Sequence, residues 1–498
     1  MKKKYVRWTL WTIASPFILF IILCILIYLP PIQNFLVDKA AVYASEATGM
    51  NISVGRISLS FPLNLVVTNV DAASPHNDTL LSVRRLQVNV QLLPLLKKQV
   101  EVDGISLQGA TVNSNDLIHG MKLNGTLGEL FISSHGVALD PETAIVNKVL
   151  LKDTDLSLCL NDTAAADTAA SDTAYWKIIL QDIDLQNVSF ALDMPLDSLS
   201  LAASLDNAIL RDGLIDLHKS AYSLQTFRIE NGRVRYDNGK PLAADSLSSG
   251  LDPSHIALTD IGVKLDSLYY GGRNMKAIIS QFVLKERSGV EIVSATGRMV
   301  SNDKVLRVPS LKLETRDSYL ELNAAMDWNA LDFKDEGLVS ARLMADIGKP
   351  DVVRFMGSMD EKFIRQYPSE PLRIRTGIDG DLNKLKLTTL TAELPGALGL
   401  FARGELTHLT DSLLRGGDIT LEAETKDLKF VSTLAEGIEI PYGTRLEGKF
   451  TMAGTKMGTD LLLMQPEAQA VVAADTIPIT VYNDSISVAD DFKMERAA

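Results

Sequence analysis

The 498-residue chain has little of what most catalytic sites require. It contains two cysteines, Cys24 and Cys159, and because Cys24 lies in an apolar segment that cannot reach Cys159, we expect no disulfide framework and no zinc site. Its six histidines show neither H-E-x-x-H nor H-x-H spacing. Glycine-rich phosphate loops, dinucleotide-binding fingerprints and G-x-S-x-G elbows are missing from the sequence. The sequence therefore predicts a protein that is not an enzyme and uses no metal or other cofactor.

Aromatic residues are also sparse, at 6% of the chain, whereas Leu, Val, Ile and Thr are abundant. This composition suits β-strands with aliphatic faces. The formal net charge is −13, and without the four cations near the N-terminus the chain has 45 basic against 62 acidic residues. Such a body repels nucleic acid, so we expect no nucleic-acid partner.

One long apolar segment is present, because Trp8 to Leu29 contains no charged residue. About 20 apolar residues cross a bilayer as a helix. All four nearby cations precede the segment, which places the N-terminus in the cytoplasm. The alternative is a cleaved signal peptide, but the apolar run is too long for one and leads into Leu29-Pro30-Pro31 rather than small residues. We therefore expect a single-pass inner-membrane protein whose bulk is periplasmic.

After the anchor, the periodicity predicts one short helix and then strands. Pro31 to Gly49 has apolar residues at helical spacing, and Gly49 suits a helix end. Strand alternation follows at Leu86, Val88 and Val90, and again around Leu311, Leu385 and Leu446. Asn231-Gly232 and Asn238-Gly239 are expected to be turns. One later helix is predicted over Asp351–Arg365, with an apolar face formed by Val352, Phe355, Met356 and Phe363.

A weak internal repeat accompanies the strands. Its template is apolar-x-apolar-x-(Gly/Asn/Asp)-x-x-apolar, and its central residue is Gly109, Asp153, Asn187, Asn231 or Asp260. We interpret each copy as the end of one strand, a turn residue that tolerates unusual dihedrals, and the start of the next strand. The spacing between copies is irregular, so chance matches in a β-rich chain are a close alternative. Either interpretation favours an extended, repetitive sheet.

Residues 161–174 (NDTAAADTAASDTA) repeat Asp-Thr-Ala three times and contain no large apolar side chain. We expect a flexible surface linker. The triplets resemble the acceptor pattern of the general O-glycosylation system of Bacteroidetes, which would make Thr163, Thr168 and Thr173 acceptors and place the chain in such a bacterium. The alternative is an unmodified acidic linker.

Several segments in order resemble the AsmA-like superfamily, and within it the TamB branch. They are the anchor and PIQNFLVDKAAVYASEATG (31–49), then NISVGRISLSFPLNLVVTNV (51–70), and later DGDLNKLKLTTLTAELPGALGLFARGEL (379–406). The resemblance implies a long curled sheet, open along one side, with an apolar groove and no catalytic residues. It also implies a bridge between the two membranes that carries phospholipid or assists outer-membrane protein assembly with a partner of the BamA or TamA type. The family's C-terminal partner-binding domain is not recognisable, so we expect an N-terminal fragment.

The sequence thus predicts a mainly β fold in which an elongated curled sheet with an open apolar groove follows two N-terminal helices. Its expected parts are a tip and transmembrane anchor (1–30), an amphipathic helix (31–49), an AsmA-like β region (50–160), the linker (161–176) and the continuing groove (177–498). Groove-lining candidates alternate with polar residues, at Ile105, Leu107, Ile183, Leu185, Leu385 and Leu387. A tethered scaffold that binds partner strands by β-augmentation is the main alternative function. A glycan hydrolase with carboxylates meeting across strands is a third.

Overall fold

The computed structural model describes residues 39, 41–42, 45, 49–60, 64–74, 79–90, 102–118, 121–138, 142–161, 176–239, 250–331, 336–356, 361–433, 442–465, 470–474, 479–482, 485–488 and 494–497. Strands dominate this part of the chain, which confirms the mainly β prediction. The chain separates into two compact units. Unit 1 consists of Met1–Ser220 and Ile229–Lys240, and unit 2 consists of Ala221–Arg228 and Pro241–Ala498.

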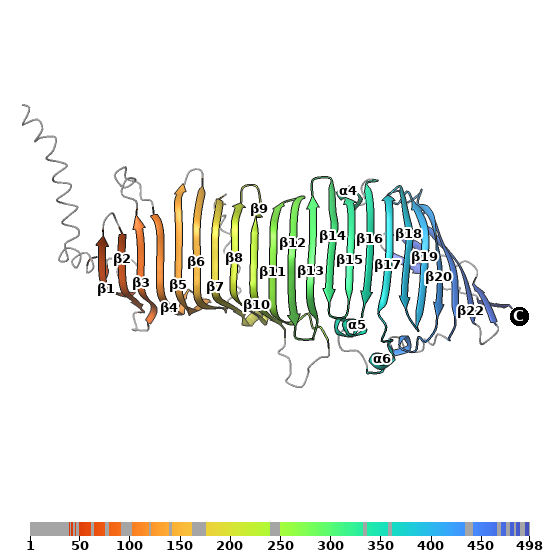
Figure 1. Ribbon diagram of the computed structural model, residues 1–498, viewed down its shortest axis with the longest axis horizontal. Coiled ribbons are helices and arrows are strands. Elements are labelled where there is room, and N and C mark those ends of the chain that lie inside the picture. The colour runs from red at the N-terminus through yellow and green to blue at the C-terminus, as the bar shows by residue number, and fades with distance from the viewer. Residues whose placement is uncertain are drawn as a thin grey trace, which may run out of the picture. The chain divides into compact units, whose positions relative to one another are not determined.

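Unit 1 is a sheet of long strands that pair in chain order (Figure 1). Its strands are β1 (Asn51–Ser60), β2 (Asn64–Ala73), β3 (Thr79–Val90), β4 (Val102–Ile118), β5 (Met121–Ala138), β6 (Thr143–Leu160), β7 (Lys177–Met194), β8 (Leu199–Asp216) and most of β10 (Thr226–Asn238). A 3-10 helix, η1 (Pro195–Asp197), links β7 to β8. The pairs from β1 to β8 are antiparallel except β6 with β7, which is parallel. The expected linker, with Thr163, Thr168 and Thr173, joins these two strands and lies, apart from Asn161 and Trp176, outside the described residues.

The central residues of the repeat do not lie in turns between strands. They have positive φ angles of 48° to 61°, which confirms their tolerance of unusual dihedrals. Each lies inside a strand, however, at Gly109, Asp153, Asn187, Asn231 and Asp260. The strand–turn–strand interpretation is therefore wrong, as is the turn expected at Asn231-Gly232. Asn69 of β2 and Asp212 of β8 have the same conformation.

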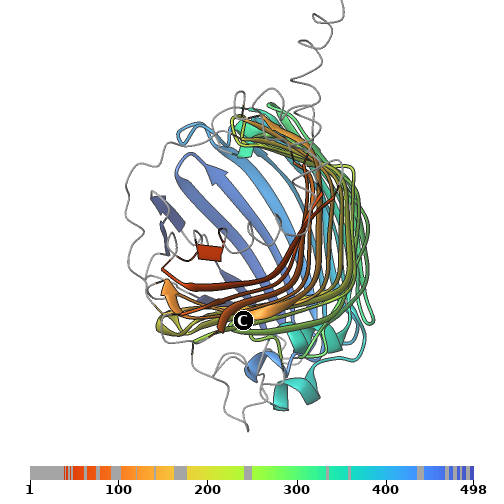
Figure 2. The same ribbon diagram turned by 90° about the vertical axis from the view of Figure 1, so that its left-hand side faces the viewer.

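In unit 1 most of these residues share one level of the sheet, which we call the bend row. The register places the row at Gly55, Asn69, Arg84, Gly109, Gly128, Asp153, Asn187 and Asp206, from β1 to β8. A left-handed residue interrupts the extended course of a strand and bends it. Figure 2 shows the strands of unit 1, coloured red to yellow, changing direction partway along their length.

The bend row also shifts the alternation of side chains. Successive side chains of an extended strand point to opposite faces. In β6, however, Lys152 and Asp153 are both exposed, and the next residue, Thr154, is only 2% exposed. Residues on the less exposed face are therefore two apart within each arm of the strand but three apart across the bend.

Unit 2 continues the antiparallel pattern. Its strands are β9 (Ala221–Leu224), β11 (His255–Gly271), β12 (Asn274–Glu286), β13 (Glu291–Ser301), β14 (Val305–Thr315), β15 (Tyr319–Asp327), β16 (Leu338–Ile347), β17 (Leu372–Asp381), β18 (Lys384–Leu394), β19 (Leu398–Thr407), β20 (Gly416–Thr425), β21 (Arg445–Ala453), β22 (Lys456–Gln465), β23 (Ala470–Ala474), β24 (Ile479–Tyr482), β25 (Ser485–Val488) and β26 (Met494–Ala497). From β11 to β23 each strand pairs with the next. The strands predicted around Leu311, Leu385 and Leu446 are confirmed as β14, β18 and β21.

The described helices of unit 2 are short. They are α4 (Trp328–Leu331), α5 (Lys349–Phe355), α6 (Glu361–Gln366) and the 3-10 helix η2 (Val431–Thr433). The single helix predicted over Asp351–Arg365 is wrong, because α5 and α6 replace it. Phe363 is buried as expected, but Phe355 and Met356 are 55% and 42% exposed. The carboxylate of Asp351 in α5 accepts hydrogen bonds from Thr315 and Ser318. The predicted helix is divided because α5 ends at Phe355, where the cap residue Met356 donates its N–H to Val352 O at 3.0 Å and a poor helix former, Gly357, follows in the sequence.

The N-terminal predictions fall mostly outside the described residues, including the whole Trp8–Leu29 segment. Within Pro31–Gly49, residues 39, 41, 42 and 45 are helical. Gly49 has φ +70° and donates its N–H to Ser45 O at 2.9 Å, as a helix-terminating glycine does. Among the residues that the structure describes, a helix with the length and apolarity needed to cross a membrane is not found.

Candidate functional site

The register of unit 1 places its four expected groove residues on two neighbouring rows. The first row consists of Leu59, Leu65, Val88, Ile105, Ile132, Val149, Ile183 and Leu210. The second row consists of Ile57, Val67, Leu86, Leu107, Leu130, Leu151, Leu185 and Ala208. Every member of both rows is aliphatic, so the two rows form a continuous apolar strip from β1 to β8. We call this strip the first wall.

A second apolar strip lies beyond the bend row. Its first row consists of Val54, Val70, Val83, Ala110, Leu127, Thr154, Val188 and Leu205. Its second row consists of Ile52, Ala72, Leu81, Val112, Gly125, Leu156, Phe190 and Ala203. Thr154 is the polar exception, and its hydroxyl donates to Lys152 O at 3.2 Å within the same strand. We call this strip the second wall, and both walls together the unit 1 track.

Burial places the unit 1 track on the inner side of the bend. Val83, Ala110 and Thr154 lie next to the bend row and are 6%, 8% and 2% exposed. A side chain in a single sheet layer becomes this buried only if the sheet folds around it. Away from the bend, Ile105 is 37% and Phe190 38% exposed. Contacts among the described elements of unit 1 run between neighbouring strands, so these elements place no second layer over this face and leave the track accessible.

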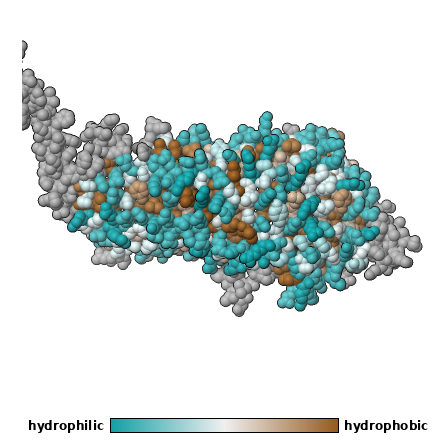
Figure 3. Space-filling model, viewed as in Figure 1, coloured by the Kyte–Doolittle hydropathy of each residue, from teal (hydrophilic) through white to brown (hydrophobic). Residues whose placement is uncertain are grey.

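The opposite face of unit 1 is polar. Next to the bend it carries Arg56, Thr68, Arg85, Gln108, Glu129, Lys152, Gln186 and Asn207 on one row. Arg211 binds Asp184 here at 2.8 Å and also contacts Asp182. Figure 3, which views the strands from their outer side, shows mostly hydrophilic side chains with smaller hydrophobic patches. One apolar and one polar face is the pattern of a sheet that faces water on one side.

Unit 2 has a track of its own. One row consists of Val263, Phe282, Ala295, Leu313, Leu320, Ala345, Ile374, Ala392, Leu400, Ala423 and Leu446, from β11 to β21. The next row consists of Leu265, Ile279, Gly297, Leu311, Leu322, Leu343, Thr376, Leu390, Ala402, Leu421 and Gly448. The expected residue Leu387 lies on a third row, between Ile378 and Gly404. These rows form the unit 2 track.

Small hydrophobic clusters border the unit 2 track at opposite ends of its middle strands. At one end, Phe363 and Tyr367 pack with Phe430, with ring centroids 5.1 to 5.8 Å apart, against Leu394 and Leu398. At the other end, Ala330, Val339 and Leu382 form a cluster. The expected groove residue Leu385 packs against this second cluster, so it lies where the start of β18 is covered.

Sequence reasoning missed most track residues, including the second wall and nearly all of the unit 2 track. A signal for the second wall was present in the repeat template, whose last apolar position is Val112, Leu156 or Phe190 in unit 1. The strand–turn–strand interpretation places that position in a following strand, whereas it belongs to the same strand beyond the bend.

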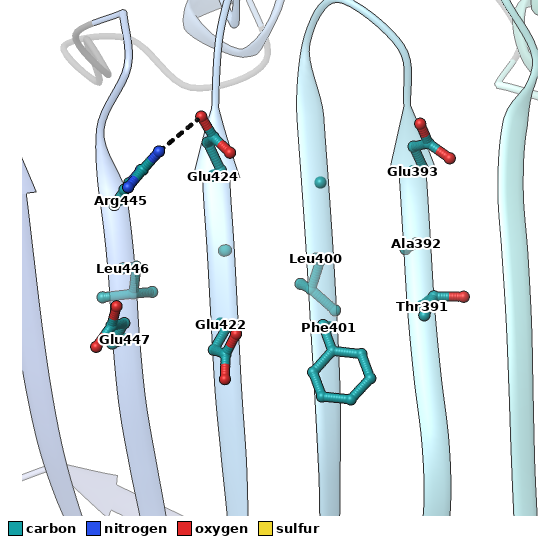
Figure 4. A pocket seen from close by; sticks show the side chains of 12 residues that line it. Thr391, Ala392, Glu393, Leu400, Phe401, Glu422, Glu424, Arg445, Leu446 and Glu447 are labelled. Atoms are coloured by element: carbon teal, nitrogen blue, oxygen red, sulfur yellow. Dashed lines mark ion pairs between the residues drawn. The ribbon is translucent and has the colours of Figure 1, made fainter.

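A hollow lined by several carboxylates lies on the polar face of unit 2 (Figure 4). Glu393 and Glu424 flank Gly399, around whose missing side chain nothing lies within 4 Å. Glu422 lies directly opposite Glu447, and Arg445 pairs with Glu424 at 3.6 Å. These residues are offset by one from Ala392, Leu400, Ala423 and Leu446 of the track, so the hollow lies on the opposite face. Its glutamates are carboxylates on neighbouring strands, the residue type that the glycan hydrolase alternative requires.

Elsewhere on this polar face, charges are matched across strands. Lys285 Nζ lies 2.7 Å from Asp260 Oδ2, and the hydrogen bond and charge of Asp260 raise the pKa of Lys285. Arg375 pairs with Asp346 at 2.6 Å. Such cross-strand pairs favour the observed register. The hollow departs from this pattern because two glutamates face each other there.

Among the described residues, no group of three or more His, Cys, Asp or Glu side chains is placed to hold a metal ion. No model of a known protein family matches the chain, and no curated protein matches its sequence.

Proposed function

We propose that the chain is a lipid conduit, a TamB-like member of the AsmA-like superfamily that carries phospholipid along its apolar tracks. The observation that supports this most is the unbroken succession of aliphatic side chains across neighbouring strands on one face only. In most globular domains, a sheet with one apolar face buries that face against a second layer of strands or helices. In unit 1 the described elements leave it accessible.

The tracks suit acyl chains chemically. Transfer of each CH₂ group from water to an apolar surface contributes about 0.8 kcal/mol. An acyl chain that lies across several strands is therefore retained without a specific polar contact. Because the rows run across the strands, an acyl chain finds equivalent positions on successive strands. A lipid can therefore move along the track without losing its contacts all at once.

The proposal includes the setting inferred from the sequence. The Trp8–Leu29 segment would anchor the protein in the inner membrane, with the sheet in the periplasm. An outer-membrane assembly protein of the BamA or TamA type would be the partner with which the chain carries phospholipid toward the outer membrane or assists protein assembly there. The resemblance of the segments quoted above supports this setting.

Photocrosslinking tests the proposal in the full-length, membrane-anchored protein. Benzoylphenylalanine is introduced at Leu151, which lies on the first wall, or at the adjacent Lys152, which is exposed on the polar face. We expect phospholipid adducts from position 151 and few from position 152. Equal labelling at both positions, or none at either, would contradict a conduit. Adducts to a protein strand at position 151 would instead support the β-augmentation scaffold.

A further inference from the structure

We infer that the left-handed residues of the bend row are positioning residues for the conduit, because they hold both apolar walls on one side of the sheet. This inference rests on the proposed function. The residues concerned are Asn69, Gly109, Asp153 and Asn187.

The spacing of the wall residues carries the argument. In β7, Leu185 belongs to the first wall, and Val188 and Phe190 belong to the second. Ordinary alternation from Leu185 would turn Ser189, Ala191 and Asp193 toward the track and the apolar residues away from it. The left-handed conformation of Asn187, with φ 51°, supplies the extra residue that keeps Val188 and Phe190 inward.

The strands opposite the left-handed residues are adapted to them. A Cβ atom at Gly128 would lie 2.8 Å from Asp153 Cβ, and one at Gly55 would lie 3.0 Å from Asn69 Cβ. The side chains of Asp153 and Asn69 therefore occupy the space that a side chain on the facing strand would need. Two strands together form each bend, so the row acts as a unit.

The bend is built differently in the parallel pair of β6 and β7. Its two left-handed residues lie side by side, and Asn187 Nδ2 donates to Asp153 Oδ1 at 2.9 Å. Asparagine and aspartate adopt the left-handed region more readily than other non-glycine residues, whereas a β-branched residue does not. The identity of residue 187 therefore controls whether the second wall of β7 stays in phase with the first.

The test uses a C16 fatty acid that carries a photoreactive diazirine. It is applied to the purified full-length protein, and labelled peptides are quantified around Leu185 on the first wall and Leu192 beyond the bend. Asn187→Gly should label both regions as the parent does, because glycine retains the left-handed conformation. Asn187→Val should keep its labelling around Leu185 and lose roughly tenfold around Leu192.

Each outcome is decisive. A parent protein labelled in neither region would remove the proposed function itself. Unchanged labelling around Leu192 in Asn187→Val would overturn the inference and leave the conduit intact. If that variant does not fold, Asn187→Ala decides, because alanine disfavours the left-handed region without branching at Cβ. Labelling around Leu192 equal to that of Asn187→Gly would then overturn the inference.

Discussion

Asn187 donates a side-chain hydrogen bond of 2.9 Å to Asp153, and both residues have left-handed backbones within long strands. The bond joins β6 to β7, which run parallel. A parallel pair has a different hydrogen-bond pattern from the antiparallel pairs on either side of it. The apolar rows nevertheless cross this pair unbroken, as the pairing of Leu151 with Leu185 shows. The bend row therefore preserves the unit 1 track where the topology changes.

Gly128 provides a direct test of the fit at the bend row. Gly128→Ala should destabilise the protein by about 1–3 kcal/mol, because the new Cβ would clash with Asp153. Urea denaturation measures the loss. The matched control is Gly399→Ala, where nothing lies within 4 Å and alanine suits a strand better than glycine, so no loss is expected. Similar losses in both variants would argue against a specific fit at Gly128.

Exposed and covered track residues should respond differently to an introduced charge. Ile105→Asp should fold normally, because this side chain is 37% exposed and water can solvate the carboxylate. Leu385→Asp should lose about 2–4 kcal/mol, because Leu385 packs against the cluster of Ala330, Val339 and Leu382. Urea midpoints compare the two. We further expect Ile105→Asp to reduce lipid crosslinking at Leu151. A severe folding defect in Ile105→Asp would indicate a covered face.

The sequence predicts the class of structure well, because period-2 alternation depends only on local geometry. It places Leu86, Leu311 and Leu446 in strands that the structure confirms. It also identifies Asn187 and Asp153 as residues with unusual dihedrals. It does not show that strands continue through these residues, because a left-handed residue marks a turn and a mid-strand bend equally well. The single helix expected over Asp351–Arg365 is wrong because α5 ends at Phe355, just before Gly357 in the sequence, so the apolar residues of the predicted stripe belong to two separate helices.

The register, and hence the tracks, depends on pairing between distant strands. No local pattern specifies that Leu107 and Leu185 share a row, since β5 and β6 lie between them. The small residues Ala392 and Ala423 were not selected because alanine gives a weak periodic signal, although the register places both on the unit 2 track.

Glu286 should make the stability of unit 2 depend on pH. It is only 6% exposed. Burial alone would raise its pKa, but hydrogen bonds from Ser288 and from the backbone N–H of Ala257 outweigh burial and lower the pKa. A lowered folded-state pKa gives stability that is present above the unfolded-state pKa and lost as the pH falls through the folded-state value.

We therefore expect Glu286→Gln to be less stable than the parent at pH 7, with the difference closing as the pH falls below about 4. Urea midpoints measured between pH 7 and pH 3 provide the comparison. Asp303→Asn, in another turn of unit 2, serves as a control for removing one negative charge. A stability difference that stays constant across this range would show that the hydrogen-bonded carboxylate of Glu286 is not responsible.

Asp351 and Asp317 provide a final comparison, because both pair with Arg354 Nη1, at 3.0 and 2.8 Å. Asp351 is 1% exposed and also accepts hydrogen bonds from Thr315 and from Ser318, the latter at 2.6 Å. The side chain of Asp317 is 31% exposed. Removal of a buried, hydrogen-bonded charge leaves its partners unsatisfied, whereas a solvated ion pair contributes little.

Asp351→Asn should therefore destabilise the protein by about 2–4 kcal/mol, and Asp317→Asn by less than about 1 kcal/mol. Denaturation in urea at neutral pH measures both. The larger loss should include detachment of α5, because this helix binds Thr315, at the end of β14, and Ser318, just before β15, through Asp351. Faster proteolysis near α5 in Asp351→Asn alone would support this assignment. Equal losses in the two variants would mean that the ion pair with Arg354, and not the buried hydrogen bonds, fixes the helix to the sheet.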